Sequence, residues 1–322
     1  MSTTEAPALA TFAEDVRQGL TSSPKFLPSQ YLYDAQGDHL FQQIMHMDTY
    51  YPMNCELEIL QTYREDLLAL FREGDRAFNL IEFGAGDGYK TRVLLEYFQQ
   101  QKAQFTYKPI DISGNVLQIL EDDLKSRLPG LDLTPLVGEY FEVLDSVAQS
   151  EDRNVILFMG GNIGNFSHEK AIDFLSAIQA RMKPEDLLFV GFDQMKDPRV
   201  ILSAYDDPEG ITREFNLNLL DRMNRELGAH FQRAHFQHFP HYDPLTGACR
   251  SYLISRKAQE IPIDALHLTV SFEAWEPMYM EVSQKYTPAG IRSMATRAGL
   301  EDRRHFTDGR SYYINALLQP ES

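Results

Sequence analysis

The sequence predicts an α/β protein in which a doubly wound, mostly parallel sheet carries a second, α+β domain. Between residues 78 and 194, short runs that are apolar on both faces alternate with longer segments of helical period. Such strands are typical of parallel sheets covered by helices on both sides. From about residue 195 to 285 this alternation stops, and mostly β-like segments follow one helix. That change in pattern predicts an inserted second domain.

The expected elements follow in chain order. Strands are expected at 78–83, 106–113, 131–140, 154–161 and 186–194, with helices at 90–101, 115–128 and 167–181 between them. The irregular part holds a helix at 211–227 and strand-like runs at 230–239, 249–257, 265–272 and 278–286. A helix at 289–300 and strand-like runs at 303–308 and 312–319 close the sheet. The domains expected are therefore 56–194 with 286–322, and 8–55 with 195–285.

Charge and composition limit the class of partner. The chain has 30 basic and 47 acidic residues, a formal charge of −17, which disfavours binding to phosphate backbones. The expected substrate is small and carries positive or mixed charge. No signal peptide and no apolar stretch of about 20 residues is recognisable, and the two cysteines show neither disulfide-framework nor metal-ligand spacing. We therefore expect a cytoplasmic monomer that binds neither nucleic acid nor membrane.

A glycine-rich turn follows the first expected strand, in the sequence EFGAGDG at 82–88. In doubly wound sheets, ligands bind at the carboxyl ends of the strands. Two features favour S-adenosylmethionine over NAD: the spacing is not G-x-G-x-x-G, and polar residues end the next two strands. Asp111 is placed to accept ribose hydroxyls, and Glu139 with Tyr140 suits an adenine ring. Alternatively, Asp111 is a turn residue or helix cap, although Ser113 could serve as that cap.

Candidate substrate residues lie elsewhere. The turn GGNIGNF at 160–166 follows the fourth strand and brings an asparagine amide, with one acceptor and two donors, to the ligand edge; the alternative is an ordinary turn. Several of the 16 tyrosines lie in polar segments, although most tyrosines are packing residues. Glu281 and Ser283 alternate on one expected strand and could hold both nitrogens of an imidazole, or simply form its polar face.

Other chemistries receive less support. The histidines at 230, 235, 238 and 241 have spacings that match neither a helical pair nor one strand face, so no metal site is expected. No nucleophile elbow or Ser-His-Asp arrangement indicates a hydrolase.

Taken together, these segments resemble the histidine-specific N-α-methyltransferases of ergothioneine biosynthesis, which form hercynine. The resemblance covers nearly the whole chain. Its specific parts are LPSQYLYDAQGDHLFQQI, TYYP with CELEIL, SAYDDPEGITREFNLNLL and MEVSQKY, beside EFGAGDGYKTRVLL, PIDIS and GGNIGNF. The family implies a Rossmann-like methyltransferase fold with a substrate-binding second domain. Fungal dimethylallyltryptophan N-methyltransferases are more distant relatives.

The resemblance also implies roles for individual residues. The cofactor, S-adenosylmethionine, would be surrounded by Gly84, Lys90, Asp111, Glu139, Tyr140 and Gly160. The substrate amine and carboxylate would be held by Tyr33, Tyr50, Asn165 and Tyr205, and the imidazole by Glu281 and Ser283. Tyr33 and Asn165 would be the catalytic residues. Three positions depart from the family pattern and concern side-chain preference: Glu139 with Tyr140 replaces a more usual Asp-Phe pair, Ser251 replaces a methionine, and Asn162 replaces a frequent threonine.

The expected reaction is therefore trimethylation of the α-amino group of L-histidine. In such a transfer the protein mainly orients a neutral amine towards the donor, and Tyr33 or water relays the proton. Three alternatives stay open at the level of sequence. They are the same chemistry on tryptophan, tyrosine or arginine, a nicotinamide-dependent oxidoreductase, and a non-catalytic binding protein.

Overall fold

The computed structural model describes residues 5–72, 76–147 and 150–321. The chain divides into two compact units. The sheet unit comprises Pro52–Met195 and Gln284–Ser322, and the insertion unit comprises Met1–Tyr51 and Lys196–Ser283. Each unit contains segments that are far apart in the sequence, so each is described by itself.

The sheet unit contains one seven-stranded sheet, in the order β11-β12-β5-β4-β1-β2-β3. The strands are β1 (Phe78–Phe83), β2 (Phe105–Asp111), β3 (Leu136–Val137), β4 (Arg153–Phe158), β5 (Leu187–Asp193), β11 (Leu300–Thr307) and β12 (Tyr313–Pro320). Six strands run in one direction, and β12 alone among the seven is antiparallel to its neighbours β5 and β11. The order reverses between β1 and β4, which is the switch point where such sheets bind ligands. The prediction of a doubly wound sheet closed by a C-terminal hairpin is confirmed.

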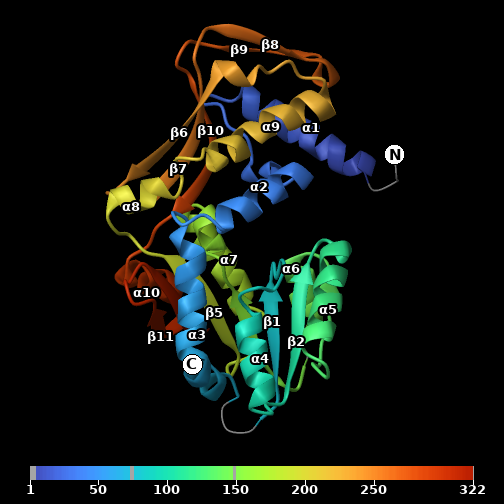
Figure 1. Ribbon diagram of the computed structural model, residues 1–322, viewed down its shortest axis with the longest axis vertical. Coiled ribbons are helices and arrows are strands. Elements are labelled where there is room, and N and C mark those ends of the chain that lie inside the picture. The colour runs from blue at the N-terminus through green and yellow to red at the C-terminus, as the bar shows by residue number, and fades with distance from the viewer. Residues whose placement is uncertain (1–4, 73–75, 148–149, 322) are drawn as a thin grey trace. The chain divides into compact units, whose positions relative to one another are not determined.

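Helices cover both faces of this sheet (Figure 1). They are α3 (Tyr51–Arg72), α4 (Arg92–Gln100), α5 (Gly114–Arg127), α6 (Tyr140–Val147), α7 (His168–Gln179) and α10 (Pro288–Arg297). On one face, buried side chains of α6, α7 and α10 pack on alternate residues of β1, β4, β5 and β12. On the other, Phe71 of α3 and Phe98 of α4 form ring contacts with Phe78 and with each other. The strands β1, β4, β5 and β12 are therefore buried on both sides, as their continuous apolar runs predict.

Two local predictions are wrong. The third strand was expected at 131–140, but β3 has only two residues, and Tyr140 begins α6. Pro135 lacks the N–H that a strand needs, and Gly138 has a φ of 152°, so the paired segment is short. The helical spacing of residues 90–101 predicts an apolar face made of Val93, Leu94 and Tyr97, but the buried side chains of α4 are Leu94, Leu95 and Phe98.

The insertion unit is built from helices and two small antiparallel sheets, so the prediction of an α+β second domain is confirmed. Its helices are α1 (Glu5–Thr21), α2 (Ala35–Met45), α8 (Pro198–Ser203) and α9 (Ile211–Leu227), with a 3-10 turn, η1, at Ser29–Leu32. One sheet has the order β10-β7-β6 (Pro277–Gln284, Ala248–Ser255, Phe236–Asp243), and β8 (Gln259–Ile263) pairs with β9 (Leu268–Phe272). A common core unites α1, α9 and these strands.

Backbone bonds join the two points where the chain leaves the sheet unit and returns to it. Met195 N–H donates to the Tyr286 carbonyl at 2.9 Å, and Tyr286 N–H donates to the Asp193 carbonyl at 2.8 Å. Next to them, the buried Lys285 ammonium lies 2.7 Å from the Asp193 carboxylate. The two ends of the inserted stretch therefore lie side by side. Among the described residues, no helix is both long enough and apolar enough to cross a membrane.

Candidate active site

The glycine turn after β1 leaves an open space at the switch point. Gly84 and Gly86 have positive φ angles of 65° and 55°, a region that glycine adopts without strain. A Cβ placed on Gly86 would meet no atom within 4 Å, so a ligand can approach this backbone. A Cβ on Gly84 would lie 3.0 Å from the Tyr140 hydroxyl. Gly84 and Tyr140, both predicted cofactor residues, therefore lie together.

Asp111 lies at the end of β2, beside this turn. One of its carboxylate oxygens accepts from Ser113 N–H at 2.9 Å, while the Ser113 hydroxyl caps α5 by accepting from Val116 N–H. Ser113, and not Asp111, is thus the helix cap. Burial, followed by the charges of Asp111 and Glu139, raises the pKa of Tyr140, whose ring stacks on Phe83 at 4.7 Å. The Asp111 carboxylate at the end of β2 and the Tyr140 side chain at the start of α6 are therefore neighbours.

Lys90 and Gly160 are bridged by Glu56, a residue not predicted from the sequence. The buried carboxylate of Glu56, near the start of α3, accepts from Lys90 Nζ and, at 2.8 Å, from Gly160 N–H. A signal for it exists in the sequence: Glu56 lies within the apolar stripe of Cys55, Ile59 and Leu60, where a carboxylate needs a partner. Gly84, Lys90, Asp111 and Gly160 follow the carboxyl ends of β1, β2 and β4, and Tyr140 and the exposed Glu139 follow that of β3.

Glu82, the second residue before Gly84, is a further buried carboxyl group below the turn. It accepts hydrogen bonds from the Thr91 hydroxyl at 2.7 Å and from the Tyr107 hydroxyl. Burial raises the pKa of Glu82 to about 7, although these two hydrogen bonds and Lys90 oppose the shift. Glu82 therefore changes its protonation state near neutral pH, directly under the candidate cofactor site.

This raised pKa predicts how stability varies with pH. The Glu82 carboxyl titrates at 4.5 in its ordinary state and at about 7 in the folded protein. Between those values the unfolded state binds fewer protons, so the contribution of Glu82 to the free energy of unfolding falls as pH rises. We expect Glu82→Gln to remove this contribution. In urea unfolding between pH 4.5 and 8, the free energy of unfolding of Glu82→Gln minus that of wild type should therefore increase with pH.

The comparison with wild type is essential because His238 has the opposite effect. Burial lowers the pKa of His238 to about 4 from 6.5, so its contribution to stability is lost as pH falls below 6.5. Glu301, which is exposed and pairs with Arg303, provides the matched control Glu301→Gln. A difference between Glu82→Gln and wild type that is constant with pH would contradict the prediction.

The insertion unit brings together five of the six predicted substrate residues in two groups. Tyr205, just after α8, donates its hydroxyl to Ser283 of β10 at 2.8 Å. Burial, then the Glu281 charge and then Tyr50 raise the pKa of Tyr33. Glu281 and Ser283 lie two residues apart on β10, which links the two groups. Tyr33 is consequently a neutral hydroxyl at physiological pH.

Tyr33 is held in place by residues of α2 and α9. Its ring makes edge contacts with Phe41 of α2 and Phe215 of α9, each at 5.4 Å. The next residue, Asp34, is the N-cap of α2 and accepts from Gly37 N–H and from the Asn218 amide of α9. The surrounding protein therefore desolvates the Tyr33 hydroxyl without covering the residue, which remains 39% exposed.

Tyr279, Arg250 and Tyr252 lie near Glu281 and were not predicted from the sequence. Burial raises the pKa of Tyr279 to about 12, with opposing effects of Arg250 and Glu281. Tyr279 also makes a ring contact with Tyr252 of β7 at 5.9 Å. No spacing rule connects residues 250–252 with 279–281; their proximity follows from the pairing of β7 with β10.

Asn165 belongs to the sheet unit and ends a 3-10 turn, η2 (Asn162–Asn165), that follows β4. Both asparagines of this turn are exposed, whereas Gly164 is buried against the backbone of Gln284. The turn therefore presents amide groups at the ligand edge of the sheet. Ser251 is only 1% exposed on β7, and its influence on side-chain preference stays a prediction.

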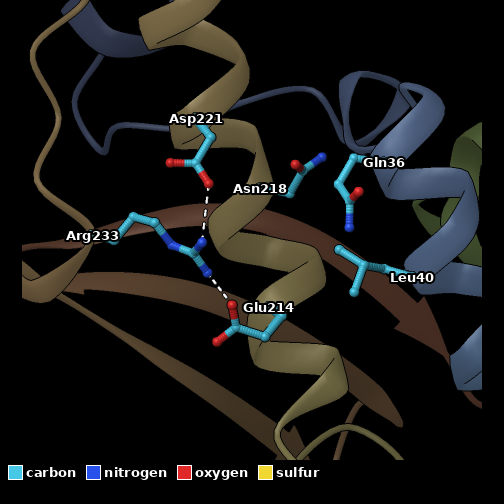
Figure 2. Close-up of a pocket in the computed structure, with 6 residues that line it drawn as sticks. All are labelled: Gln36, Leu40, Glu214, Asn218, Asp221 and Arg233. Carbon is cyan, nitrogen blue, oxygen red and sulfur yellow. Dashed lines mark hydrogen bonds and ion pairs between the residues drawn. The ribbon is translucent and has the colours of Figure 1, made fainter.

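A pocket of about 300 Å³ lies elsewhere in the insertion unit, between α2 and α9 (Figure 2). It is lined by Gln36, Leu40, Glu214, Asn218, Asp221 and Arg233. The Arg233 guanidinium pairs with Asp221 at 3.1 Å and with Glu214, so its charge is already compensated (Figure 2). None of the predicted site residues lines this pocket. Within the described ranges, no three His, Cys, Asp or Glu side chains gather as a metal site would require.

The strand order, with its antiparallel β12 beside β5, and the open glycine turn at the switch point define a Rossmann-like methyltransferase. A family model described as histidine-specific, S-adenosylmethionine-dependent methyltransferase matches residues 12–320. The chain belongs to that family, and it is an enzyme whose cofactor is S-adenosylmethionine. The nicotinamide and non-catalytic alternatives are thereby set aside.

Named relatives agree with this assignment. The histidine N-alpha-methyltransferase of Mycolicibacterium smegmatis is 34% identical over 94% of this chain and 92% of its own length. The protein of the same name from Mycobacterium tuberculosis is 34% identical over 91% of this chain and 90% of its own. Ergothioneine biosynthesis protein 1 of Schizosaccharomyces pombe is 26% identical over 80% of this chain, but over only 35% of its own length.

Proposed function

We propose that the protein transfers methyl groups from S-adenosylmethionine to the α-amino group of L-histidine, three times in succession, to give hercynine in ergothioneine biosynthesis. The observation that supports this most directly is the match of the histidine-specific family model to nearly the whole chain. The names of the mycobacterial and fission-yeast relatives support the substrate and the pathway.

The residues at the switch point fit the cofactor. A carboxylate at the end of β2 can accept two ribose hydroxyls, the Tyr140 ring offers a flat surface for adenine, and Lys90 offers an ammonium to the methionine carboxylate. S-adenosylmethionine, when bound, supplies a methyl group on a positively charged sulfur. We propose that Gly84 and Glu139 complete this site and that Gly160 borders it.

For the amino acid, we propose that the insertion unit is the substrate-binding domain. Tyr33, Tyr50 and Tyr205 would hold the amine and carboxylate together with Asn165, whereas Glu281 and Ser283 would bind the imidazole. The contact between Tyr205 and Ser283 and the electrostatic effect of Glu281 on Tyr33 support this grouping. A carboxylate and a hydroxyl can serve one imidazole nitrogen each.

The protein's part in the reaction is orientation and proton transfer. A positive charge beside the amine lowers the amine's pKa, so the neutral form needed for attack is accessible. Tyr33 has a raised pKa and is therefore a neutral hydroxyl, able to accept a hydrogen bond and pass a proton on to water but not to act as a phenolate base. We propose this relay role for Tyr33, with Asn165 orienting the amine.

The test is to incubate the pure protein with S-adenosylmethionine and the twenty amino acids and to analyse the mixture by mass spectrometry. The expected result is histidine with one, two and finally three added methyl groups. Methylation of tryptophan, tyrosine or arginine in preference to histidine would contradict the substrate assignment and leave the reaction class intact.

We further infer a cytoplasmic, monomeric enzyme. Both cysteines, Cys55 and Cys249, are buried and free, which suits a reducing compartment. Burial, followed by Asp308, raises the pKa of the Cys55 thiol to about 12, so this thiol is protonated and unreactive. Size-exclusion chromatography with light scattering measures the oligomeric state.

A further inference from the structure

Glu56 is a completely buried carboxylate that connects four other residues of the sheet unit. Its Oε2 accepts from Lys90 Nζ and from Gly160 N–H. Its Oε1 accepts from the Asn315 amide at 2.9 Å and from the Tyr313 hydroxyl at 3.2 Å. A single side chain on α3 thus connects β12 with the glycine turn and with the end of β4.

The centre of the sheet makes room for this carboxylate. Gly191 lies within β5, where glycine normally weakens a strand and often marks the close approach of another group. A Cβ on Gly191 would lie 2.4 Å from Glu56 Oε1 and 2.4 Å from the Tyr313 hydroxyl. The interior strand β5 therefore lacks a side chain at the position that Glu56 occupies.

The other end of the network reaches the cofactor edge. The side chain of Lys90 is 18% exposed, while that of Glu56 is 1% exposed, so the ion pair is largely shielded from water. A Cβ on Gly160 would lie 3.5 Å from Lys90 Nζ, which places the ammonium beside this exposed backbone. One carboxylate oxygen thus fixes both groups relative to each other.

We propose that Glu56 is a positioning residue for S-adenosylmethionine, acting through Lys90 and Gly160. The proposal rests on the cofactor roles proposed above for these two residues. An ammonium has three N–H donors, so binding Glu56 leaves donor capacity for the methionine carboxylate. Glu56 also balances the charge of Lys90, which would otherwise repel the positively charged sulfur of the cofactor.

The test is the variant Glu56→Gln, which keeps the size of the side chain but not its charge. Its amide then places a donor or an uncharged oxygen against the lysine. We expect the affinity for S-adenosylhomocysteine, measured by calorimetry, to fall by about ten- to a hundredfold, as for the loss of a hydrogen bond to a charged group. The KM for S-adenosylmethionine should rise in parallel, whereas the KM for histidine should change little.

Two further variants separate positioning from stability. Asp186 is a buried carboxylate just before β5 that accepts from Asn154 N–H at 2.8 Å and from Lys183 N–H at 2.9 Å. It lies at the amino ends of β4 and β5, whereas the candidate cofactor site lies at their carboxyl ends. Asp186→Asn should lower the melting temperature without changing cofactor affinity. In a double-mutant cycle, adding Glu56→Gln to Lys90→Gln should weaken binding little further, because both changes disrupt one interaction.

Wild-type affinity for S-adenosylhomocysteine in Glu56→Gln would overturn the proposal. So would full additivity with Lys90→Gln, or an equal loss of cofactor affinity in Asp186→Asn. Calorimetry with S-adenosylhomocysteine requires no amino acid. A wrong assignment of histidine as substrate would therefore leave this measurement and its conclusion unaffected.

Discussion

Replacement of Asp111 by alanine is expected to reduce the affinity for S-adenosylhomocysteine by about a hundredfold or more. The carboxylate at the end of β2 can accept both ribose hydroxyls, and hydrogen bonds to charged groups contribute about 1.5–3 kcal/mol each. The fold should persist, because Ser113 supplies the cap of α5 and the Asp111 carboxylate accepts from Ser113 N–H. The Asp111 carbonyl, which accepts from Gly138 N–H at 3.1 Å, is kept in the alanine variant. Calorimetric titration measures the loss.

The control is Asp132→Ala. Asp132 is also an aspartate beside β2, but it is exposed and accepts from the Thr106 hydroxyl at 2.9 Å near the start of that strand. Its removal should leave cofactor affinity at the wild-type value. An unchanged affinity in Asp111→Ala itself would exclude Asp111 from the cofactor site.

The second large effect concerns the choice of amino acid. Glu281→Ala should lower kcat/KM for histidine relative to that for tryptophan by about ten- to a hundredfold, because the imidazole N–H loses a charged acceptor. An apolar ring has no use for that acceptor, and the larger, less polar pocket should admit it somewhat better. The measurement is the ratio of the two kcat/KM values in wild type and variant.

Glu276 provides a control close in sequence and in the same unit. It lies just before β10 and pairs with Lys25 at 2.5 Å, so Glu276→Ala removes a carboxylate without touching the proposed imidazole site. The ratio should stay as in wild type. If Glu281→Ala leaves the ratio unmoved as well, Glu281 belongs to the polar face of the strand and does not select the substrate.

The architecture could be predicted wherever local signals and packing agree. The helix at 211–227 is found with both ends correct because Gly210 and Gly228 adopt left-handed backbone at its limits and its apolar positions repeat with helical period. The strands β1, β4, β5 and β12 are apolar on both faces and were therefore recognisable. The six-residue α8 was missed because it is too short to show a period, and β8 because Pro262 interrupts its pattern.

The cofactor edge could be predicted in part because chain order alone brings the carboxyl ends of parallel strands together. This rule places Gly84, Asp111 and Gly160 at one edge without any knowledge of side-chain packing. Glu56 could not be found in that way. Its partners lie 34, 104, 257 and 259 residues away in the sequence, and only the packing of α3 on the sheet brings them within hydrogen-bond distance.

The paired ends of the inserted stretch allow residues 196–283 to change in sequence and length independently of the sheet. Tyr286 forms backbone hydrogen bonds with both Met195 and Asp193. Residues 196–283 therefore form an insertion whose two ends lie side by side in the sheet unit. The entropy of closing such an insertion increases only slowly with its length. Residues can therefore be gained, lost or replaced between these ends while the connectivity of the seven strands stays the same. The residues proposed above to bind the imidazole, Glu281 and Ser283, lie in this stretch, so their replacement leaves the part of the chain that holds the glycine turn unchanged.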